Sequence, residues 1–336
     1  MRCSPCSTLH EPAGPPWATK GLLRNPGRIP VCAARRYTRD RSARLPEEAL
    51  TPARRDGAKR QRARLSFDLG WQLLLELLLL GAAAGFVAGL LGVGGGMLMV
   101  PFMTLILSAR GMPAQYIVKM AVATSLATIC FTSIASVRAH HQKGAVRWDV
   151  VRLLAPGILL GGLLGAQIAI ALPARGLAML FAVFVALSAT QMILNKKPRP
   201  SRRLPGGAGL FGVGGLIGSV SALVGAGGAF LSVPFMTACN LPIHTAVATA
   251  AAIGFPIALA GTAGYVIGGW SLADMPAGTL GYIYLPALLT IAAASVVTAP
   301  IGARTAHRMN VAQLKRVFAT LLFALAAYMF YQGFGG

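Results

Sequence analysis

Ten apolar runs, separated by short polar interruptions, follow one another from Trp71 to the end of this chain. A helix needs about 20 apolar residues to cross the ~30 Å hydrocarbon layer of a bilayer, and most of the runs approach that length. Because 55% of the 336 residues are hydrophobic and the mean hydropathy is +0.63, we expect lipid to surround much of the chain. The sequence therefore predicts an all-α, polytopic integral membrane protein of the cell (plasma or inner) membrane, with about eight to ten membrane segments.

The predicted segments are residues 71–91, 97–108, 113–137, 150–172, 176–194, 206–224, 229–239, 243–267, 279–303 and 311–331. The segments that begin at Met97 and Ala229 are too short to cross a bilayer alone.

The ionisable residues divide the chain into two unlike parts. Residues 1–70 hold 15 basic and 6 acidic side chains, whereas residues 71–336 hold 16 basic and only 3 acidic ones. Those three, Glu76, Asp149 and Asp274, are too few and too scattered for an enzyme built on paired carboxylates. The apolar part also contains no Cys-x-x-Cys pair, no intramembrane His pair and no G-x-x-x-x-G-K-[ST] motif. We therefore expect a protein that is not an enzyme or an ATP pump and that needs no metal or cofactor.

The net charge of +22 would suggest a nucleic-acid partner if it coated a folded polar domain. Here the basic residues lie in the first 69 residues and in short loops between apolar runs, so no nucleic-acid partner is expected. Residues 1–69 are rich in Arg, Pro, Ala and Ser without a helical or alternating period, and we expect a disordered basic tail. It resembles either an Arg-rich targeting segment or an extension that is not translated in the cell, and its acidic residues favour the second interpretation.

The two short segments occupy corresponding positions in a duplicated unit. Residues 81–103 match residues 214–236 at 12 of 23 positions without a gap, and Ala-Val-Ala-Thr at 121–124 recurs at 246–249. This pattern predicts two transmembrane repeats, 70–194 and 206–336, joined by a polar linker at 195–205. Doubled hydrophobic segments that are interrupted by Gly are typical of secondary transporters built from inverted or tandem repeats.

Each predicted repeat contains a cluster of glycines just before its short segment, at 92–96 and 225–228. Each Gly costs a helix roughly 1 kcal/mol, so the helix is expected to break there and expose backbone N–H groups. At the start of the next half-helix these groups would attract an anion. The candidate substrate-binding glycines are Gly92, Gly94, Gly95, Gly96, Gly225, Gly227 and Gly228. The alternative is that they only permit close helix packing, which is the role expected for the spaced glycines Gly81, Gly85, Gly89, Gly157, Gly161 and Gly165.

These motifs resemble the sulfite exporter TauE/SafE family of membrane permeases. The resemblance is carried by residues 89–96 with Val100-Pro101, by 121–125, and by 225–228 with Val233-Pro234 and the second Ala-Val-Ala-Thr. It covers nearly all of residues 70–335, although Ala229 stands where the second glycine run of the family usually continues. The family implies transport of small sulfur-containing anions such as sulfite or organosulfonates, and related members handle other organic anions.

Hydroxyl groups and cations near the glycine clusters are further candidates, because a desolvated anion must recover its hydration from fixed donors. Lys119 and His244 occupy matching repeat positions, but Lys119 is equally compatible with a membrane interface and His244 with an ordinary loop. Four hydroxyl residues, Thr124, Ser125, Thr128 and Thr249, follow on the same predicted helices. These hydroxyls bind either the substrate or carbonyls of their own helices.

For each of two polar residues inside apolar runs, the sequence is compatible with two roles. Gln167 joins helices or binds the substrate, and Glu76 carries a coupling proton or lies at the interface. Basic clusters at 138–152, in the linker and at 304–316 indicate loops. Counting each broken segment as one crossing places the last cluster opposite the other two.

The sequence thus predicts a permease that moves a small anion through a central site between two broken helices, with the lipid bilayer as its other partner. A permease for carboxylates, or a membrane scaffold without transport, is the alternative. A homo-oligomer is compatible with the sequence, which leaves the oligomeric state open.

Overall fold

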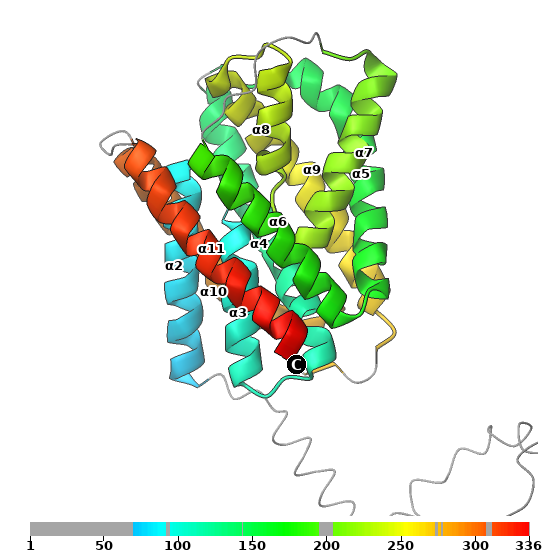
Figure 1. Cartoon of the computed structure of the whole chain (residues 1–336), viewed down its shortest axis with the longest axis vertical. Helices are drawn as coiled ribbons and strands as arrows, with labels where there is room; N and C mark the ends of the chain where they lie inside the picture. Colours follow the sequence, from blue (N-terminus) through cyan, green and yellow to red (C-terminus); the bar gives the residue numbers. More distant parts are fainter. Residues whose placement is uncertain are drawn as a thin grey trace, which may run out of the picture. The chain divides into compact units, whose positions relative to one another are not determined.

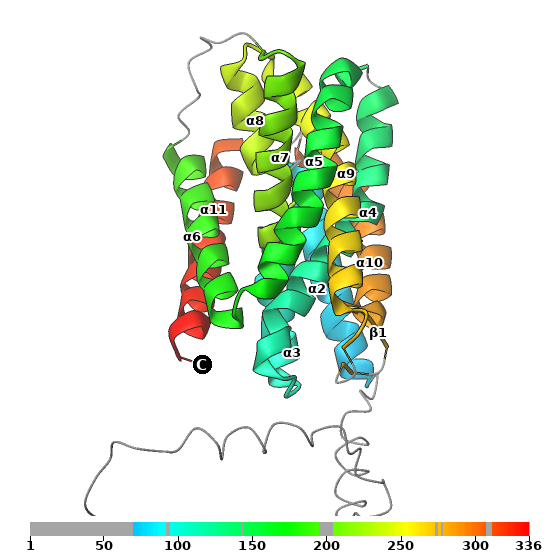
Figure 2. The ribbon, with the colours of Figure 1, turned by 90° about the vertical axis from the view of Figure 1, so that its right-hand side faces the viewer.

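The computed structural model describes residues 70–91, 95–142, 144–194, 204–272, 275–276, 278–306 and 311–335. The predicted tail, most of the predicted linker, and the candidate glycines Gly92 and Gly94 lie outside these residues. Within the described part the chain is almost entirely α-helical (Figures 1 and 2). Its helices are α2 (Trp71–Leu91), α3 (Gly96–Ala109), α4 (Ala114–Gln142), α5 (Trp148–Ala171), α6 (Ala174–Leu194), α7 (Gly207–Val224), α8 (Ala229–Ala238), α9 (Ile243–Gly269), α10 (Leu285–Ala306) and α11 (Val311–Gly335).

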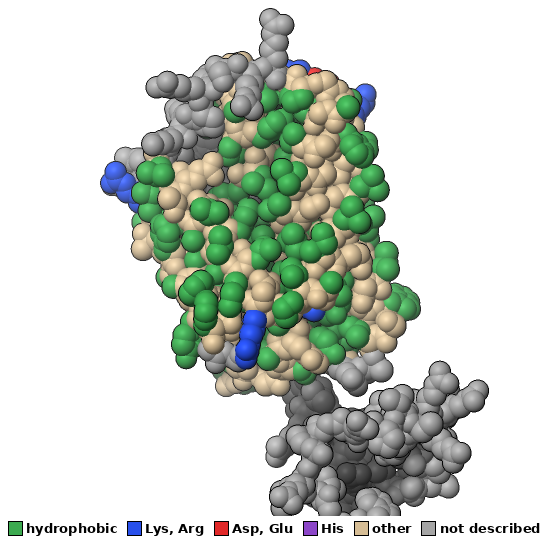
Figure 3. All heavy atoms as spheres, turned by 45° about the vertical axis from the view of Figure 1, so that its right-hand side comes forward, with side chains coloured by type: hydrophobic (Ala, Val, Ile, Leu, Met, Phe, Trp, Pro, Cys, Tyr) green, Lys and Arg blue, Asp and Glu red, His purple; other side chains and the backbone are tan. Residues whose placement is uncertain are grey.

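Eight of these helices are long and apolar enough to cross a membrane, and only α3 and α8 are shorter. Large hydrophobic side chains lie on their outer surfaces, where Leu79 is 62% exposed, Leu216 66% and Val297 68%. In water such exposure would be costly, whereas in a bilayer these side chains meet lipid tails. Figure 3 shows hydrophobic side chains over most of one side of the bundle, with Lys and Arg near its two ends. The protein is therefore a multi-pass integral membrane protein.

One predicted boundary is wrong. The apolar run from Thr279 was expected to be helical throughout, but β1 (Thr279–Leu280) pairs antiparallel with β2 (Ile283–Tyr284), and α10 begins only at Leu285. Gly281 lies in the turn at a φ of +57°, a conformation that side chains with a Cβ rarely adopt. The turn chemistry of Gly278 and Gly281 thus overrides the apolar composition of this run.

Helices α4 and α9 form the centre of the bundle. In each of them 61% of the most apolar stretch is buried, against 33–44% in the other six spans. The two helices pack against each other, and each carries one of the two Ala-Val-Ala-Thr motifs predicted to be equivalent. Residues on these helices are therefore the ones least exposed to lipid.

Five of the six spaced glycines, all but Gly89, form two helix interfaces, as the sequence predicts. A Cβ at Gly81 would lie 2.8 Å from the Ile291 backbone, and one at Gly85 would meet Ser295, so α2 packs closely along α10. Likewise a Cβ at Gly157, Gly161 or Gly165 would meet the backbone of α7. In both pairs the residue numbers of the contacts increase together along the two helices, so the helices of each pair are parallel. Each pair joins one helix of the first predicted repeat to one of the second.

The helix directions are opposite in the two halves of the chain. Short connections make consecutive helices run in opposite directions in the series α4, α5 and α6, and likewise in the series α9, α10 and α11. Because α7 is parallel to α5 and α10 is parallel to α2, the second half begins at the end of the bundle opposite to the first (Figure 2). Opposite directions of this kind are those of inverted-topology repeats in transporters.

Each short helix runs back toward the end of the bundle at which the helix before it began (Figure 1). Gly95 lies against the Ala84 carbonyl of α2, and Gly228 lies against Ser221 and Ile217 of α7. The pair α2–α3 therefore begins and finishes at one end of the bundle, and the pair α7–α8 begins and finishes at the opposite end (Figure 1). From the sequence, each of these broken segments was counted as one crossing of the membrane. That count is wrong, because each pair returns to the end at which it began. The ends of α4, α6 and α10 and the starts of α5, α7 and α11 then lie at the same end of the bundle (Figure 2).

Candidate functional site

The break between α7 and α8 is formed by two glycines in the left-handed region. Gly225 has a φ of +70° and Gly228 a φ of +73°. The N–H of Gly225 closes the end of α7 by donating to the Ser221 carbonyl, and Gly228 caps the start of α8. A residue with a Cβ would be strained at both positions, so the Gly cluster is required by the backbone.

The two glycine clusters meet in the interior of the bundle. A Cβ at Gly96, the first residue of α3, would collide with the Gly225 carbonyl oxygen. The Ser125 hydroxyl of α4 lies between them, donating to the Gly225 carbonyl at 3.0 Å, with the Gly96 carbonyl 3.5 Å away. Gly95, Gly96, Ser125 and Gly225 are all buried. Residues 129 positions apart in the sequence are thus brought into contact, with Ser125 as their bridge.

This meeting point lies near the middle of a membrane. Ser125 is the twelfth residue of α4, which places it about 17 Å along the helix at 1.5 Å per residue. That distance is about half of a ~30 Å hydrocarbon layer. Sites near the bilayer midplane, formed where helices are broken, are those that secondary transporters use for substrates.

The start of α8 presents hydrogen-bond donors that no residue in the described part of the chain satisfies. The N–H groups of Leu231 and Ser232 donate to the Gly228 carbonyl, at 3.1 and 2.9 Å. The N–H groups of Gly227, Gly228, Ala229 and Phe230 make no hydrogen bond to any described residue. The first three of these residues are buried, so water from outside does not satisfy them in this structure. Such donors at the positive end of a helix favour a negatively charged ligand.

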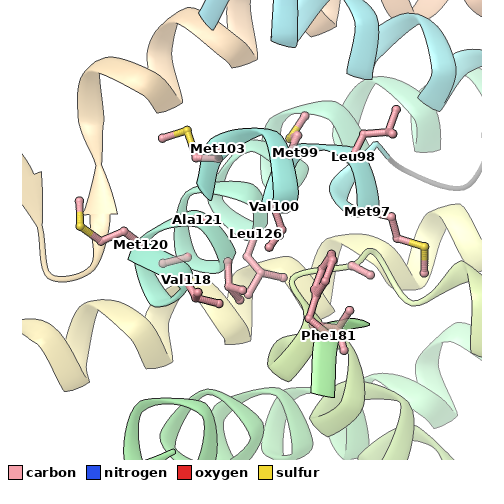
Figure 4. Close-up of a cluster of buried hydrophobic side chains, with 14 of the residues drawn as sticks. Met97, Leu98, Met99, Val100, Met103, Val118, Met120, Ala121, Leu126 and Phe181 are labelled. Atoms are coloured by element: carbon pink, nitrogen blue, oxygen red, sulfur yellow. The ribbon is translucent and has the colours of Figure 1, made fainter. Parts of the chain in front are cut away.

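Apolar side chains enclose this region. Figure 4 shows the methionines and Leu98 of α3 packed with residues of α4 and with Phe181 of α6. Met97, Met99 and Met103 are each at most 2% exposed, which is the packing expected of flexible side chains that fill irregular gaps. A low-dielectric wall of this kind strengthens the attraction between an anion and the nearby backbone dipoles.

Two of the candidate threonines hold the starts of other helices. Thr124 accepts a hydrogen bond from the N–H of Tyr284 at 3.1 Å, just before α10. Thr249, its counterpart on α9, accepts one from the N–H of Arg147 at 3.1 Å, just before α5. Each bond joins one predicted repeat to the other, and the two lie toward opposite ends of the antiparallel pair α4 and α9. Thr128 donates to the Thr124 carbonyl at 2.9 Å, which is the bonding to its own helix that the sequence left open.

The residues preceding α10 cover the end of the bundle opposite the ends of α4, α6 and α10. Tyr282 lies between Tyr116 and Tyr265, with ring centroids 6.3 and 6.1 Å away. Tyr284 is buried, and that burial raises the pKa of its phenol to about 12, although the charge of Arg110 acts in the opposite direction. The phenol is therefore neutral at physiological pH. The Tyr265 hydroxyl donates to the Ala222 carbonyl at 3.3 Å, which connects this aromatic group to the end of α7.

The structure does not place the two candidate cations alike. The Lys119 ammonium donates to the Ile170 carbonyl at 2.6 Å, in the last turn of α5, where a positive charge offsets the negative end of the helix. His244 is exposed in the first turn of α9 and is not brought to the buried meeting point of the glycine clusters. They hold matching positions in the predicted repeats, but the local surroundings of each decide its contacts.

The other two polar residues have defined partners as well. The Gln167 amide donates to the Gly264 carbonyl at 3.0 Å and so joins α5 to α9. Glu76 forms an exposed ion pair with Arg110 at 3.3 Å, which is a weak interaction in high dielectric.

We expect Lys119→Gln to reduce stability and to leave substrate affinity unchanged. The substitution removes a charge-assisted hydrogen bond, of the kind that contributes about 1.5–3 kcal/mol, from the end of α5. Thermal unfolding of the purified protein measures the first effect, and the concentration dependence of anion uptake into proteoliposomes measures the second. Arg175 is exposed at the start of α6, so Arg175→Gln is the control for loss of a positive charge at the same end of the bundle. A raised KM in Lys119→Gln alone would instead make its ammonium a substrate ligand.

The sequence missed one polar residue in the second break. Ser221 is 1% exposed, and its hydroxyl makes no hydrogen bond in the described part of the chain. A comparison of the two predicted repeats does not identify Ser221 as a candidate. In the gap-free alignment of residues 81–103 with 214–236, the position opposite Ser221 is Ala88, which has no hydroxyl. Only the fold of the α7–α8 turn places its hydroxyl beside Gly228.

The described residues therefore define a polytopic helical membrane protein whose two helix breaks meet at mid-membrane, an arrangement typical of secondary transporters. The model of the sulfite exporter TauE/SafE family matches residues 77–329. The chain belongs to this family, as the sequence motifs predicted.

The chain matches relatives described as membrane transporters over almost their full lengths. A protein of Haemophilus influenzae with the description "probable membrane transporter protein" is 38% identical over 259 residues, which cover 76% of this chain and 98% of that protein. Proteins of Methanocaldococcus jannaschii and Bacillus subtilis with similar descriptions are each 24% identical, over 79% and 76% of this chain and 98% and 97% of their own lengths. No solved structure matches the chain. The family and these relatives place the chain among membrane permeases, which is consistent with a protein that is not an enzyme.

Proposed function

We propose that this permease is a secondary transporter of a small anion, and that the anion is a sulfur-containing one such as sulfite or an organosulfonate. The observation that carries the proposal is the buried start of α8, where four backbone N–H groups have no partner among the described residues. Burying unpaired donors costs free energy unless a ligand satisfies them, and an anion at a helix N-terminus is the ligand best suited to do so. The name of the family supports sulfite as the first substrate to test.

The binding site in this proposal lies at the meeting point of the two breaks. Its donors are the backbone N–H groups at the start of α8, with Gly225, Gly227 and Gly228 shaping the turn that exposes them. Gly95 and Gly96 bring α3 to the same point, and Ser125 holds the two clusters together. The structure describes only part of the first glycine cluster, so the proposal assigns the anion to the second.

Transport in this proposal proceeds by alternating exposure of the site to the two sides of the membrane. The opposite helix directions of the two halves provide two similar gates that face opposite ends. The Thr124–Tyr284 and Thr249–Arg147 hydrogen bonds each join the two halves, and both are formed in this structure. We infer that the site is enclosed from both ends here and that opening either end breaks the bond on that side.

Small carboxylates are the second candidate class, because backbone N–H groups bind carboxylate and sulfonate oxygens alike. A scaffold without transport would account for the packing of α2 on α10 and of α5 on α7, but it would not need unpaired donors in the interior. These alternatives make different predictions about flux.

The test is uptake of labelled sulfite, thiosulfate, a short sulfonate and acetate into proteoliposomes that contain the purified full-length protein, at a fixed pH gradient. We expect saturable uptake of at least one sulfur-containing anion, and empty liposomes give the background. Selective uptake of acetate would replace the proposed substrate class. Absence of flux for every anion, from protein that is folded and inserted, would overturn the transport proposal.

A further inference from the structure

Ser221 is a buried polar side chain whose hydroxyl has no partner among the described residues. Serines in membrane helices usually satisfy their hydroxyl with a carbonyl of the preceding turn, and Ser232 on α8 does so by donating to the Gly228 carbonyl at 3.0 Å. Ser219, two residues before Ser221, donates to carbonyls of both α5 and α7, at 3.0 and 2.9 Å. A buried hydroxyl that stays unpaired between these examples carries a desolvation cost and requires an explanation.

The Ser221 hydroxyl points into the α7–α8 turn. A Cβ placed on Gly228 would lie 3.1 Å from the Ser221 oxygen and 3.4 Å from Ile217, and it would collide with Ile257. Gly228 is thus closely packed against two isoleucines and one hydroxyl. It adjoins the unpaired N–H groups that begin at Gly227. Two kinds of unsatisfied donor, one from a side chain and the other from the backbone, therefore lie in the same turn.

The first half of the chain lacks the same side-chain donor. In the gap-free alignment of the two halves, Ala88 stands opposite Ser221 and Met99 stands opposite Ser232. The hydroxyl is therefore a feature of the second break alone. An anion held between the two breaks would be bound unequally, with its oxygens directed at the α7–α8 turn and its other end toward the apolar side chains of α3.

No charged side chain is buried in the described part of the chain; the buried polar residues there are serines and threonines. The donors near Gly228 are thus neutral dipoles and carry no full positive charge. Buried neutral donors bind a group with several oxygens by multiple hydrogen bonds, and each bond to a charged oxygen is stronger than a neutral one. This chemistry fits the oxygens of a sulfite or sulfonate group.

We propose that the Ser221 hydroxyl is a substrate ligand, which binds an oxygen of the transported oxyanion together with the free N–H groups at the start of α8. The proposal rests on the proposed transport function and adds a residue that determines affinity. When the site is empty the hydroxyl is unsatisfied and destabilises the protein, and when the anion binds it is paired. Ser221 is therefore expected to lower the stability of the anion-free protein and to increase its affinity for the anion.

The test compares Ser221→Ala with Ser219→Ala, a serine on the same helix whose hydroxyl is already paired. Sulfite is the probe, or the sulfur-containing anion that the wild-type protein transports best. We expect Ser221→Ala to raise the KM for uptake about tenfold or more, because it removes a hydrogen bond to a charged group. We expect it to leave the thermal midpoint of the anion-free protein unchanged or higher. Ser219→Ala is expected to show the opposite pattern, with a lower midpoint and an unchanged KM.

These opposite effects on KM and on the thermal midpoint distinguish a substrate ligand from a residue with only a structural role. A Ser221→Ala protein with wild-type KM would overturn the assignment, whatever its thermal midpoint. A midpoint that falls without any change in KM would make Ser221 structural. If wild-type vesicles transport no anion, the proposed function fails first. If wild type transports and Ser221→Ala is indistinguishable from it, only the role of Ser221 fails.

Discussion

Gly96→Val is expected to lower the proposed anion transport about 100-fold while leaving the protein inserted in the membrane. The added Cβ would collide with the Gly225 carbonyl and would lie 2.9 Å from Ile129, so α3 must move away from the α7–α8 turn. Such a movement also separates Ser125 from the Gly225 carbonyl. Because displacement of a binding group by about 1 Å can cost a factor of 10², we expect the uptake rate to fall by about that factor.

The matched control is Gly212→Val on α7, where a Cβ would meet nothing within 4 Å. It adds the same side chain to a membrane helix and is expected to keep wild-type uptake. Monodispersity and the thermal midpoint of both purified variants show whether Gly96→Val remains folded. Wild-type uptake in a folded Gly96→Val protein would mean that the contact between the two breaks is not part of the transport site.

Gly161→Leu is expected to cause the largest loss of stability. A Cβ at this position would collide with the Gly215 carbonyl, where α5 and α7 pack backbone against backbone. Overpacking a core typically costs about 1–3 kcal/mol, and here the clash is with the main chain, which cannot change rotamer. We expect a loss of about 3 kcal/mol or more, which would lower the yield of folded protein in detergent.

Gly85→Leu tests the corresponding interface between α2 and α10, where a Cβ would meet the Ser295 backbone. It should produce a loss of similar size, whereas Gly212→Leu should be tolerated because its side chain has open space. Near-wild-type unfolding temperatures for both Gly161→Leu and Gly85→Leu would show that α5 and α10 do not depend on close contact with their parallel partners.

The sequence predicted most of the helices well, because a membrane span must be long, apolar and helical. The predicted segment 71–91 coincides with α2, and the two segments too short to cross became α3 and α8. The one large error, at Thr279, arose because two turn glycines redirect a run that is apolar enough for a helix. The role of Gly81 and Gly85 was also predictable, since spaced small residues permit close approach of two helices.

The candidate site could be predicted only in part. The glycine clusters at 92–96 and 225–228 were visible because a break at membrane depth needs consecutive residues without a side chain. Equal positions in the two halves suggested equal roles for Lys119 and His244, but one donates to a helix end and the other is exposed. Ser221 escaped the comparison of the halves because it has no matching hydroxyl in the first half.

By itself the sequence determined that this chain crosses a membrane many times and that its helices break at two glycine clusters, because hydropathy and backbone freedom are properties of short segments. Only the tertiary structure decided that the breaks meet at Ser125 and that α5 and α10 pack on helices from the other half of the chain. It also decided which donors are left unpaired. Those features depend on contacts between residues far apart in the chain, and such contacts have no local signature in the sequence.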